Sequence, residues 1–163
     1  MALNRAGLDV LYTQGFNPLA KLEIVSPLST RISASAEIAA AEFSHEASPG
    51  EFTAKMNAAL PEGIRVNGAE IFRIPAGSKK HSLSSLLWGF GYAGLDGETA
   101  YVPAAGEKAY REQCLSAGGT VFSLRRACVL AKNTPPDGGG QPWTSYFNAY
   151  GHLYSCKKIP YML

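Results

Sequence analysis

The sequence lacks the long apolar runs and the strong charge that mark membrane or nucleic-acid-binding proteins. No apolar run in its 163 residues approaches the roughly 18 to 20 residues of a membrane helix. The first residues, Met1–Gly7, contain no apolar segment of the kind that a signal peptide needs. The formal net charge of +2 is too small to argue for nucleic acid on electrostatics alone. These absences predict a cytoplasmic protein that makes no contact with a membrane.

Cysteine and histidine are also scarce, and their spacing excludes the common metal motifs. The three cysteines lie too far apart in sequence for a zinc or iron–sulfur motif (Cys114, Cys128 and Cys156). Cys114 and Cys128 are expected to fill the core as free thiols. The three histidines are scattered and are expected at the surface (His45, His81 and His152). No phosphate-binding glycine loop is present, and the sequence predicts no cofactor, no metal and no catalytic constellation.

The first half of the chain has the pattern of an α+β unit. Residues 2–6 followed by Gly7 resemble the last turn of a helix closed by a glycine. Ser48-Pro49-Gly50-Glu51 is a capping box that starts a helix, and its apolar face contains Phe52, Met56, Ala59 and Leu60. Strand patterns occur at residues 8–13, 21–26, 37–43 and 64–74, the last with a bulge at Gly68. This order predicts a ferredoxin-like β-α-β-β-α-β unit without its first strand and most of its first helix.

The second half predicts further α+β structure after a polar linker. The linker is residues 75–81, and a loose tail is expected at residues 156–163. Strands are predicted at 86–92, 99–102 and 120–132, and helices at 107–116 and around Tyr146–Tyr154. The expected organisation is a first lobe at residues 1–74 and a second segment at 82–155. The second segment is either a smaller, degenerate α+β lobe or part of the same sheet.

The stretch TQGFNPLAK, residues 13–21, is open to two interpretations. In the structural one, Gly15 supplies an unusual φ, Asn17-Pro18 fixes a turn and Phe16 fills the core. In the functional one, Gln14, Asn17 and Lys21 converge on a polar ligand or an RNA phosphate. Turns seldom need all three of these polar residues, so a recognition loop is favoured. Its candidate binding residues are Gln14, Gly15, Phe16, Asn17, Pro18 and Lys21.

Arg125 and Arg126 are further candidate binding residues, because one of them must lie on the apolar face of its strand. A buried arginine needs a carboxylate or a bound anion as partner. A structural ion pair is the commoner outcome, and a bulge could instead turn both side chains outward. The pair could also join other basic residues in an RNA-binding surface, although solvated charge is the simpler reading (Lys79, Lys80, His81, Lys132, Lys157 and Lys158). The tyrosines at 146, 150 and 154 are expected to pack in the core rather than stack on bases.

Three segments together resemble a known bacterial family, the radical-SAM-linked domain of unknown function. They are Arg5–Leu8, Tyr12–Pro18 with Lys21-Leu22, and Asn57–Ile64. The family pattern typically reads RAGLP-x-x-YSQGFNP-[HR]-P-K-[IL], and the resemblance extends over residues 5 to 74. Leu19 and Ala20 replace the family's basic residue and second proline. The family's N-terminal strand and longer first helix have no counterpart in this sequence.

The resemblance implies a partner domain rather than a complete enzyme. Members of the family are fused to radical SAM proteins or encoded beside them, and this chain has no CxxxCxxC cluster motif. The implied partners are therefore a radical SAM protein and, from RNA-modifying contexts, RNA. Two alternatives remain open. One is an independent small enzyme with a site around Gln14–Lys21, and the other is a truncated, non-functional remnant of the family.

Overall fold

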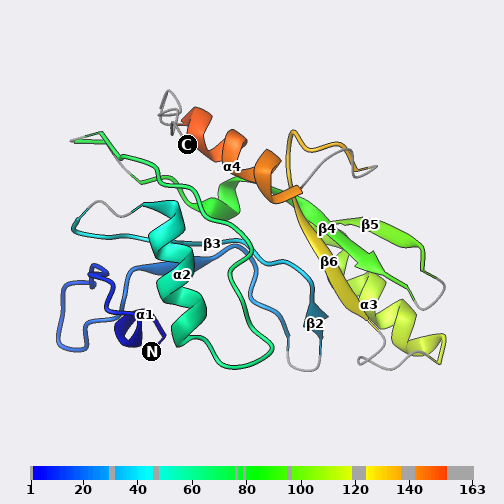
Figure 1. Cartoon of the computed structure of the whole chain (residues 1–163). Helices are drawn as coiled ribbons and strands as arrows, with labels where there is room; N and C mark the ends of the chain where they lie inside the picture. The colour runs from blue at the N-terminus through cyan, green and yellow to red at the C-terminus, as the bar shows by residue number, and fades with distance from the viewer. Residues whose placement is uncertain are drawn as a thin grey trace. The chain divides into compact units, whose positions relative to one another are not determined.

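The computed structural model describes residues 2–29, 32–45, 48–75, 77–78, 80–94, 97–118, 124–136 and 142–153. The fold is mixed α+β (Figure 1). The chain divides into two compact units. The first unit is Met1–Glu23 with Ala39–Arg73, and the second is Ile24–Ile38 with Ile74–Leu163. Among the described residues, no helix has the length and apolar character needed to cross a membrane.

The first unit has two helices on a small core, with a two-stranded sheet. Its elements are α1 (Ala2–Arg5), α2 (Pro49–Ala59), β1 (Leu22–Ile24) and β3 (Ala39–Ala41). Gly7, at φ 63°, ends the first helical turn. The Ser48 hydroxyl accepts a hydrogen bond from the Glu51 amide at 3.1 Å, which confirms the predicted cap of α2. The core of this unit contains Leu3, Leu8, Val10 and Met56.

The prediction of a strand at residues 64–74 is wrong. This segment has no regular secondary structure. One cause is visible at Val66, whose amide donates to Asn57 Oδ1 at 2.7 Å while its carbonyl accepts from Asn57 Nδ2 at 3.1 Å. A helix side chain therefore satisfies the backbone groups that a neighbouring strand would otherwise pair. Residues 8–13 likewise form only isolated bridges, Val10 with Phe43 and Tyr12 with Ala20. The described residues of this unit do not show the ferredoxin-like arrangement.

The second unit is built on a four-stranded sheet of order β2-β6-β4-β5. Its strands are β2 (Ser33–Ala34), β4 (Leu87–Ala93), β5 (Thr99–Pro103) and β6 (Arg125–Ala131). β2 runs parallel to β6, whereas β4 is antiparallel to both of its neighbours. Gly89 is required for the close approach of β4 to β5, because an added Cβ would lie 2.1 Å from the Val102 carbonyl oxygen.

The helices of the second unit agree with the sequence prediction. They are α3 (Glu107–Ser116) and α4 (Pro142–Leu153), with short 3-10 turns at η1 (Leu83–Leu86) and η2 (Ala104–Gly106). α4 packs against β6. Tyr146 and Tyr150 are buried and donate to the carbonyls of Leu83 and His81, which confirms their predicted place in the core. Tyr154, Cys156, Lys157, Lys158 and Lys79 lie outside the described residues.

The described cysteines and histidines do not form a cluster that could hold a metal ion. Cys114 and Cys128 are free and half-buried, and burial raises the pKa of the Cys128 thiol. His45 is exposed as predicted and lies 3.5 Å from Asp9. The described residues contain no group of three or more histidine, cysteine or acidic side chains placed to hold a metal ion.

Candidate functional site

The Gln14–Leu19 loop of the first unit is closed at its base by a short neck of paired backbone. The Thr13 amide donates to the Leu19 carbonyl at 2.8 Å. The Leu19 amide donates to the Thr13 hydroxyl at 3.0 Å. One step further from the loop, Tyr12 and Ala20 form an antiparallel bridge. These contacts close the loop at its base and fix where it projects.

A ring of three backbone hydrogen bonds anchors the neck. The Lys21 amide donates to the Leu11 carbonyl at 2.7 Å, and the Leu11 amide donates to the Glu42 carbonyl at 2.7 Å. The Glu42 amide closes the ring by donating to the Lys21 carbonyl at 3.1 Å. The Lys21 ammonium also pairs with Glu42 Oε2 at 3.1 Å. Lys21 therefore belongs to the base of the loop, and its charge is compensated within the protein.

The loop tip is exposed and uncharged. Phe16 is 100% exposed and Leu19 is 69% exposed, and the remaining tip residues are exposed as well (Gln14, Gly15, Asn17 and Pro18). Gly15 has φ 137°, so the unusual backbone angle predicted for it is confirmed. The structural interpretation placed Phe16 in the core, and that part of it is wrong, because the Phe16 side chain is fully exposed. No residue from Val10 to Ala20 carries a charge.

The two arginines of β6 have opposite environments. Arg125 is exposed, whereas Arg126 is only 1% exposed. Arg126 Nη1 lies 3.1 Å from Glu37 Oε2, and its Nη2 lies 2.6 Å from Glu107 Oε1. Its guanidinium also sits over the Phe90 ring, 4.1 Å from the centroid. The structural ion pair is thus the outcome for Arg126, and no bound anion is needed to explain its burial.

The ionisation of this cluster follows from its burial. Burial raises the pKa of Glu37, although the charge of Arg126 opposes the rise. Burial and a hydrogen bond to Glu107 raise the pKa of Tyr92 to about 12. Burial acts to lower the pKa of Arg126, but its bonds to Tyr92 and Glu107 and the charge of Glu37 bring it above the ordinary value. Arg126 is therefore a permanent cation of the second unit's core.

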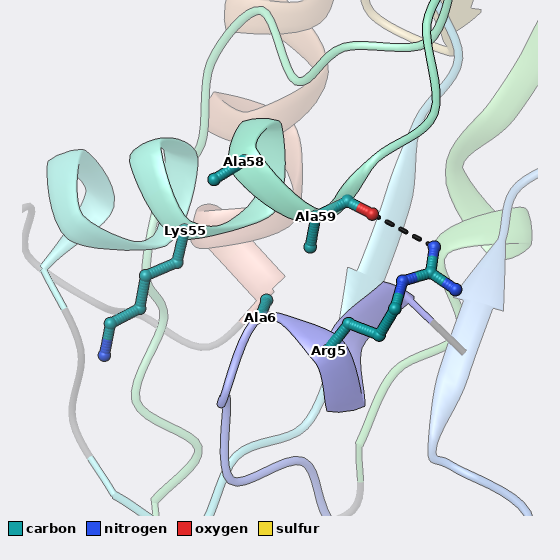
Figure 2. Close-up of a pocket in the computed structure, with 5 residues that line it drawn as sticks. All are labelled: Arg5, Ala6, Lys55, Ala58 and Ala59. Carbon is teal, nitrogen blue, oxygen red and sulfur yellow. Dashed lines mark hydrogen bonds between the residues drawn. The ribbon is translucent and has the colours of Figure 1, made fainter.

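A cavity of about 310 Å³ lies between α1 and α2, lined by Arg5, Ala6, Lys55, Ala58 and Ala59. Arg5 Nη2 donates to the Ala59 carbonyl at 3.0 Å, and Lys55 pairs with Glu51 at 2.7 Å. Figure 2 shows Arg5 directed at Ala59 and Lys55 extending away from it. Arg5 satisfies a carbonyl in the last turn of α2, where cations are favoured. The lining has no carboxylate or histidine, and its two cations, Arg5 and Lys55, are both engaged within the protein.

Sequence reasoning missed the acidic partners of the candidate residues. Glu42 pairs with Lys21, and Glu37 and Glu107 pair with Arg126. The need of a buried arginine for a carboxylate was a usable signal. It could not select two partners from 13 acidic residues, since Glu37 lies 89 positions away in sequence.

Comparison with known proteins gives a family for the chain. Searches of curated proteins and of solved structures each returned no match. One family model matches residues 1–115, a range that includes the exposed loop and ends within α3, before Arg126. The match spans well over half of the chain. The chain therefore belongs to the family described as an uncharacterized protein conserved in bacteria (DUF2344).

Proposed function

We propose that this chain is a non-catalytic accessory module that binds a partner protein through its Gln14–Leu19 loop, and that the partner is a radical SAM protein. The observation that carries the proposal is the complete exposure of Phe16 at the tip of an anchored loop. Burying a phenylalanine side chain contributes roughly 1.5–3 kcal/mol, which this fold forgoes. Aromatic side chains are enriched among the anchors of protein interfaces.

The neck favours binding because it reduces the ordering that binding would otherwise require. The bonds between Thr13 and Leu19 and the ring at Leu11, Lys21 and Glu42 hold both ends of the loop. Immobilising a loop on association costs free energy, and a loop that is already held loses less. Leu19, also exposed, extends the apolar surface that Phe16 presents.

The chemistry of the loop favours a protein over RNA. Contacts to a nucleic-acid backbone depend on lysine and arginine, but Val10–Ala20 has no charged residue. The ammonium of Lys21 is already paired with Glu42. Phe16 could still stack on an unpaired base, so RNA is a definite alternative outcome of the experiment below.

The assignment of a radical SAM protein rests on the resemblance of residues 5 to 74 to the radical-SAM-linked domain. That family occurs fused to, or encoded beside, radical SAM proteins. The tip offers an aromatic ring and two carboxamides and no acid, base or nucleophile, which supports a binding role over the alternative of an independent enzyme.

The proposal is tested by affinity purification of the tagged full chain from its native cells, with every co-purified protein and RNA identified. The variant is Phe16→Ala. The matched control is Ile64→Ala, because Ile64 is another large apolar side chain of the first unit, 60% exposed and distant from the loop in sequence. A protein with a CxxxCxxC motif should be recovered with the wild type and the control. Its recovery should fall by roughly tenfold or more with Phe16→Ala, as for an interface anchor.

Two outcomes would overturn the proposal. Equal recovery of the partner with Phe16→Ala and wild type would exclude the loop as the binding site. Recovery of an RNA that is lost with Phe16→Ala, without a radical SAM protein, would replace the protein partner by a nucleic acid. Circular dichroism verifies that each variant of the full chain remains folded.

A further inference from the structure

The segment Ile24–Ile38 belongs to the second unit, and its described residues, 24–29 and 32–38, pair with the sheet over a short stretch of backbone. Its ends meet where the Val25 amide donates to the Ile38 carbonyl at 2.9 Å. Between them, β2 pairs with β6 over two residues, Ser33 opposite Arg125 and Ala34 opposite Arg126. So short a ladder contributes little on its own, since isolated strand pairs are marginal in water.

Four of the polar contacts that fasten the described residues of this segment involve one residue, Arg126. Arg126 Nη1 donates to the Ser26 carbonyl at 2.7 Å, near the start of the segment. The same nitrogen donates to both Glu37 oxygens, at 3.2 and 3.1 Å, near its end. The Arg126 carbonyl accepts from the Ser35 amide at 2.8 Å. Weaker support comes from exposed or half-buried hydroxyls, through Ser84 to Val25 and Arg111 to Ser29.

Arg126 is also held by contacts to residues outside the segment Ile24–Ile38. Its Nη2 donates to Glu107 at 2.6 Å, and its guanidinium lies over the Phe90 ring. The Glu107 contact is shorter than the Glu37 contact, and the Glu107 side chain is 17% exposed against 25% for Glu37. Two carboxylates share one guanidinium, so release of Glu37 leaves a neutral Arg126–Glu107 pair behind. Release of Glu107 would require breaking the tighter contact.

We propose that the described parts of Ile24–Ile38, residues 24–29 and 32–38, form a strap that opens from β6, with the Glu37 contact to Arg126 as its catch. Opening transfers the Glu37 carboxylate to water and leaves the β4–β5–β6 sheet intact. It also uncovers the edge of β6 at Arg125 and Arg126, the residues that β2 covers when the strap is closed. When closed, the strap pairs with this edge of β6 and covers it. Uncovered strand edges can pair with further strands. The apolar anchors that oppose opening are Val25, Ile32 and Ile38, all buried.

The test is amide hydrogen exchange of the full chain, followed by mass spectrometry of peptides from residues 24–38 and from β4 and β6. In the wild type, strap amides should exchange at least about tenfold faster than β4 amides, as expected for a local opening below the global one. Glu37→Ala removes the acceptor and should speed exchange in the strap by roughly tenfold more, while β4 stays unchanged. Glu37→Gln keeps an acceptor oxygen and should restore most of the protection.

Two results would refute the strap. One is equal protection of the strap and β4 in the wild type, because the segment would then open only with the whole unit. The wild-type comparison stands even where Glu37→Ala fails to fold. The other is a Glu37→Ala variant whose strap exchanges like the wild type, which would mean that Glu37 is not the catch.

Discussion

Arg126→Met should destabilise the second unit more than the replacement of either of its carboxylate partners, Glu37 or Glu107. The substitution keeps an apolar stem but leaves two carboxylates, Glu37 and Glu107, without their common partner in a largely buried site. Removing one member of a buried ion pair costs about 3–5 kcal/mol, mostly through the uncompensated charge that remains. Because domains are stable by only about 5–15 kcal/mol, this loss is at least about a fifth of the total free energy of unfolding.

Intrinsic fluorescence isolates the unit concerned, because both tryptophans, Trp88 and Trp143, belong to the second unit. Urea unfolding followed by this signal gives the midpoint and slope for that unit. Arg125→Met is the matched control. Arg125 is the exposed neighbour on the same strand, and its replacement should change the free energy of unfolding by no more than about 0.5 kcal/mol.

A triple variant separates charge from packing. Combining Arg126→Met with Glu37→Gln and Glu107→Gln removes both uncompensated charges, so most of the lost stability should return. An Arg126→Met variant that loses less than about 1 kcal/mol, against the 3–5 expected for a broken buried pair, would refute the reasoning. If the triple variant stays as unstable as the single one, the loss comes from packing of the arginine stem.

Further substitutions test other interactions in the fold. Because the pKa of Tyr92 is raised to about 12, its phenol keeps its proton in the folded protein at pH values where the unfolded chain has already lost it. Stability should therefore fall as pH rises above 10, by on the order of 2–3 kcal/mol near pH 12, and Tyr92→Phe should remove that slope in urea titrations. Gly89→Ala should disrupt β4–β5 pairing, since its Cβ meets backbone at 2.1 Å, whereas Gly50→Ala, with open space around it, should be neutral or stabilising by at most about 1 kcal/mol in thermal melts. Asn57→Ala removes both hydrogen bonds to Val66 and should lower the free energy of unfolding by about 1 kcal/mol, measured by urea unfolding followed by circular dichroism; an unchanged midpoint would show that these bonds contribute nothing.

The elements that the sequence predicted well have signals within a few residues. At the start of α2 the Ser48 hydroxyl caps the Glu51 amide and Pro49 takes the first helical position, as the capping box predicts, whereas the Glu51 carboxylate pairs with Lys55. The helix at Glu107–Ser116 has the predicted bounds, and Gly118 takes φ 84° just after it. Such features depend on local backbone geometry, so they can be read without knowing the rest of the fold.

The features that the sequence did not predict depend on residues far apart in the chain. A strand needs a partner, and the segment 64–74 has a helix side chain, Asn57, at Val66 instead. β2 is two residues long and becomes a strand only through β6, some ninety positions later. The alternating pattern of β6 did predict that one arginine would be buried, but its two acidic partners come from a different loop and a different helix. These pairings are set by the whole fold rather than by local pattern.

The residues shared with the radical-SAM-linked pattern fall into two groups, and the proposed binding surface follows from that division. Arg5 bonds to the end of α2, Gly7 ends α1 and Lys21 pairs with Glu42, so the fold accounts for all three. Phe16 has no such structural task, because it is fully exposed. A partly exposed ion pair contributes only about 0–1 kcal/mol. Lys21→Ala should therefore lower stability slightly and leave partner binding close to wild type, measured by calorimetry on the purified pair. Phe16→Ala should weaken partner binding and leave stability close to wild type. If Lys21→Ala abolished binding, with a steep dependence on salt, the cation at the base of the loop would be the group that meets the ligand, and an anionic partner such as RNA would become the better reading.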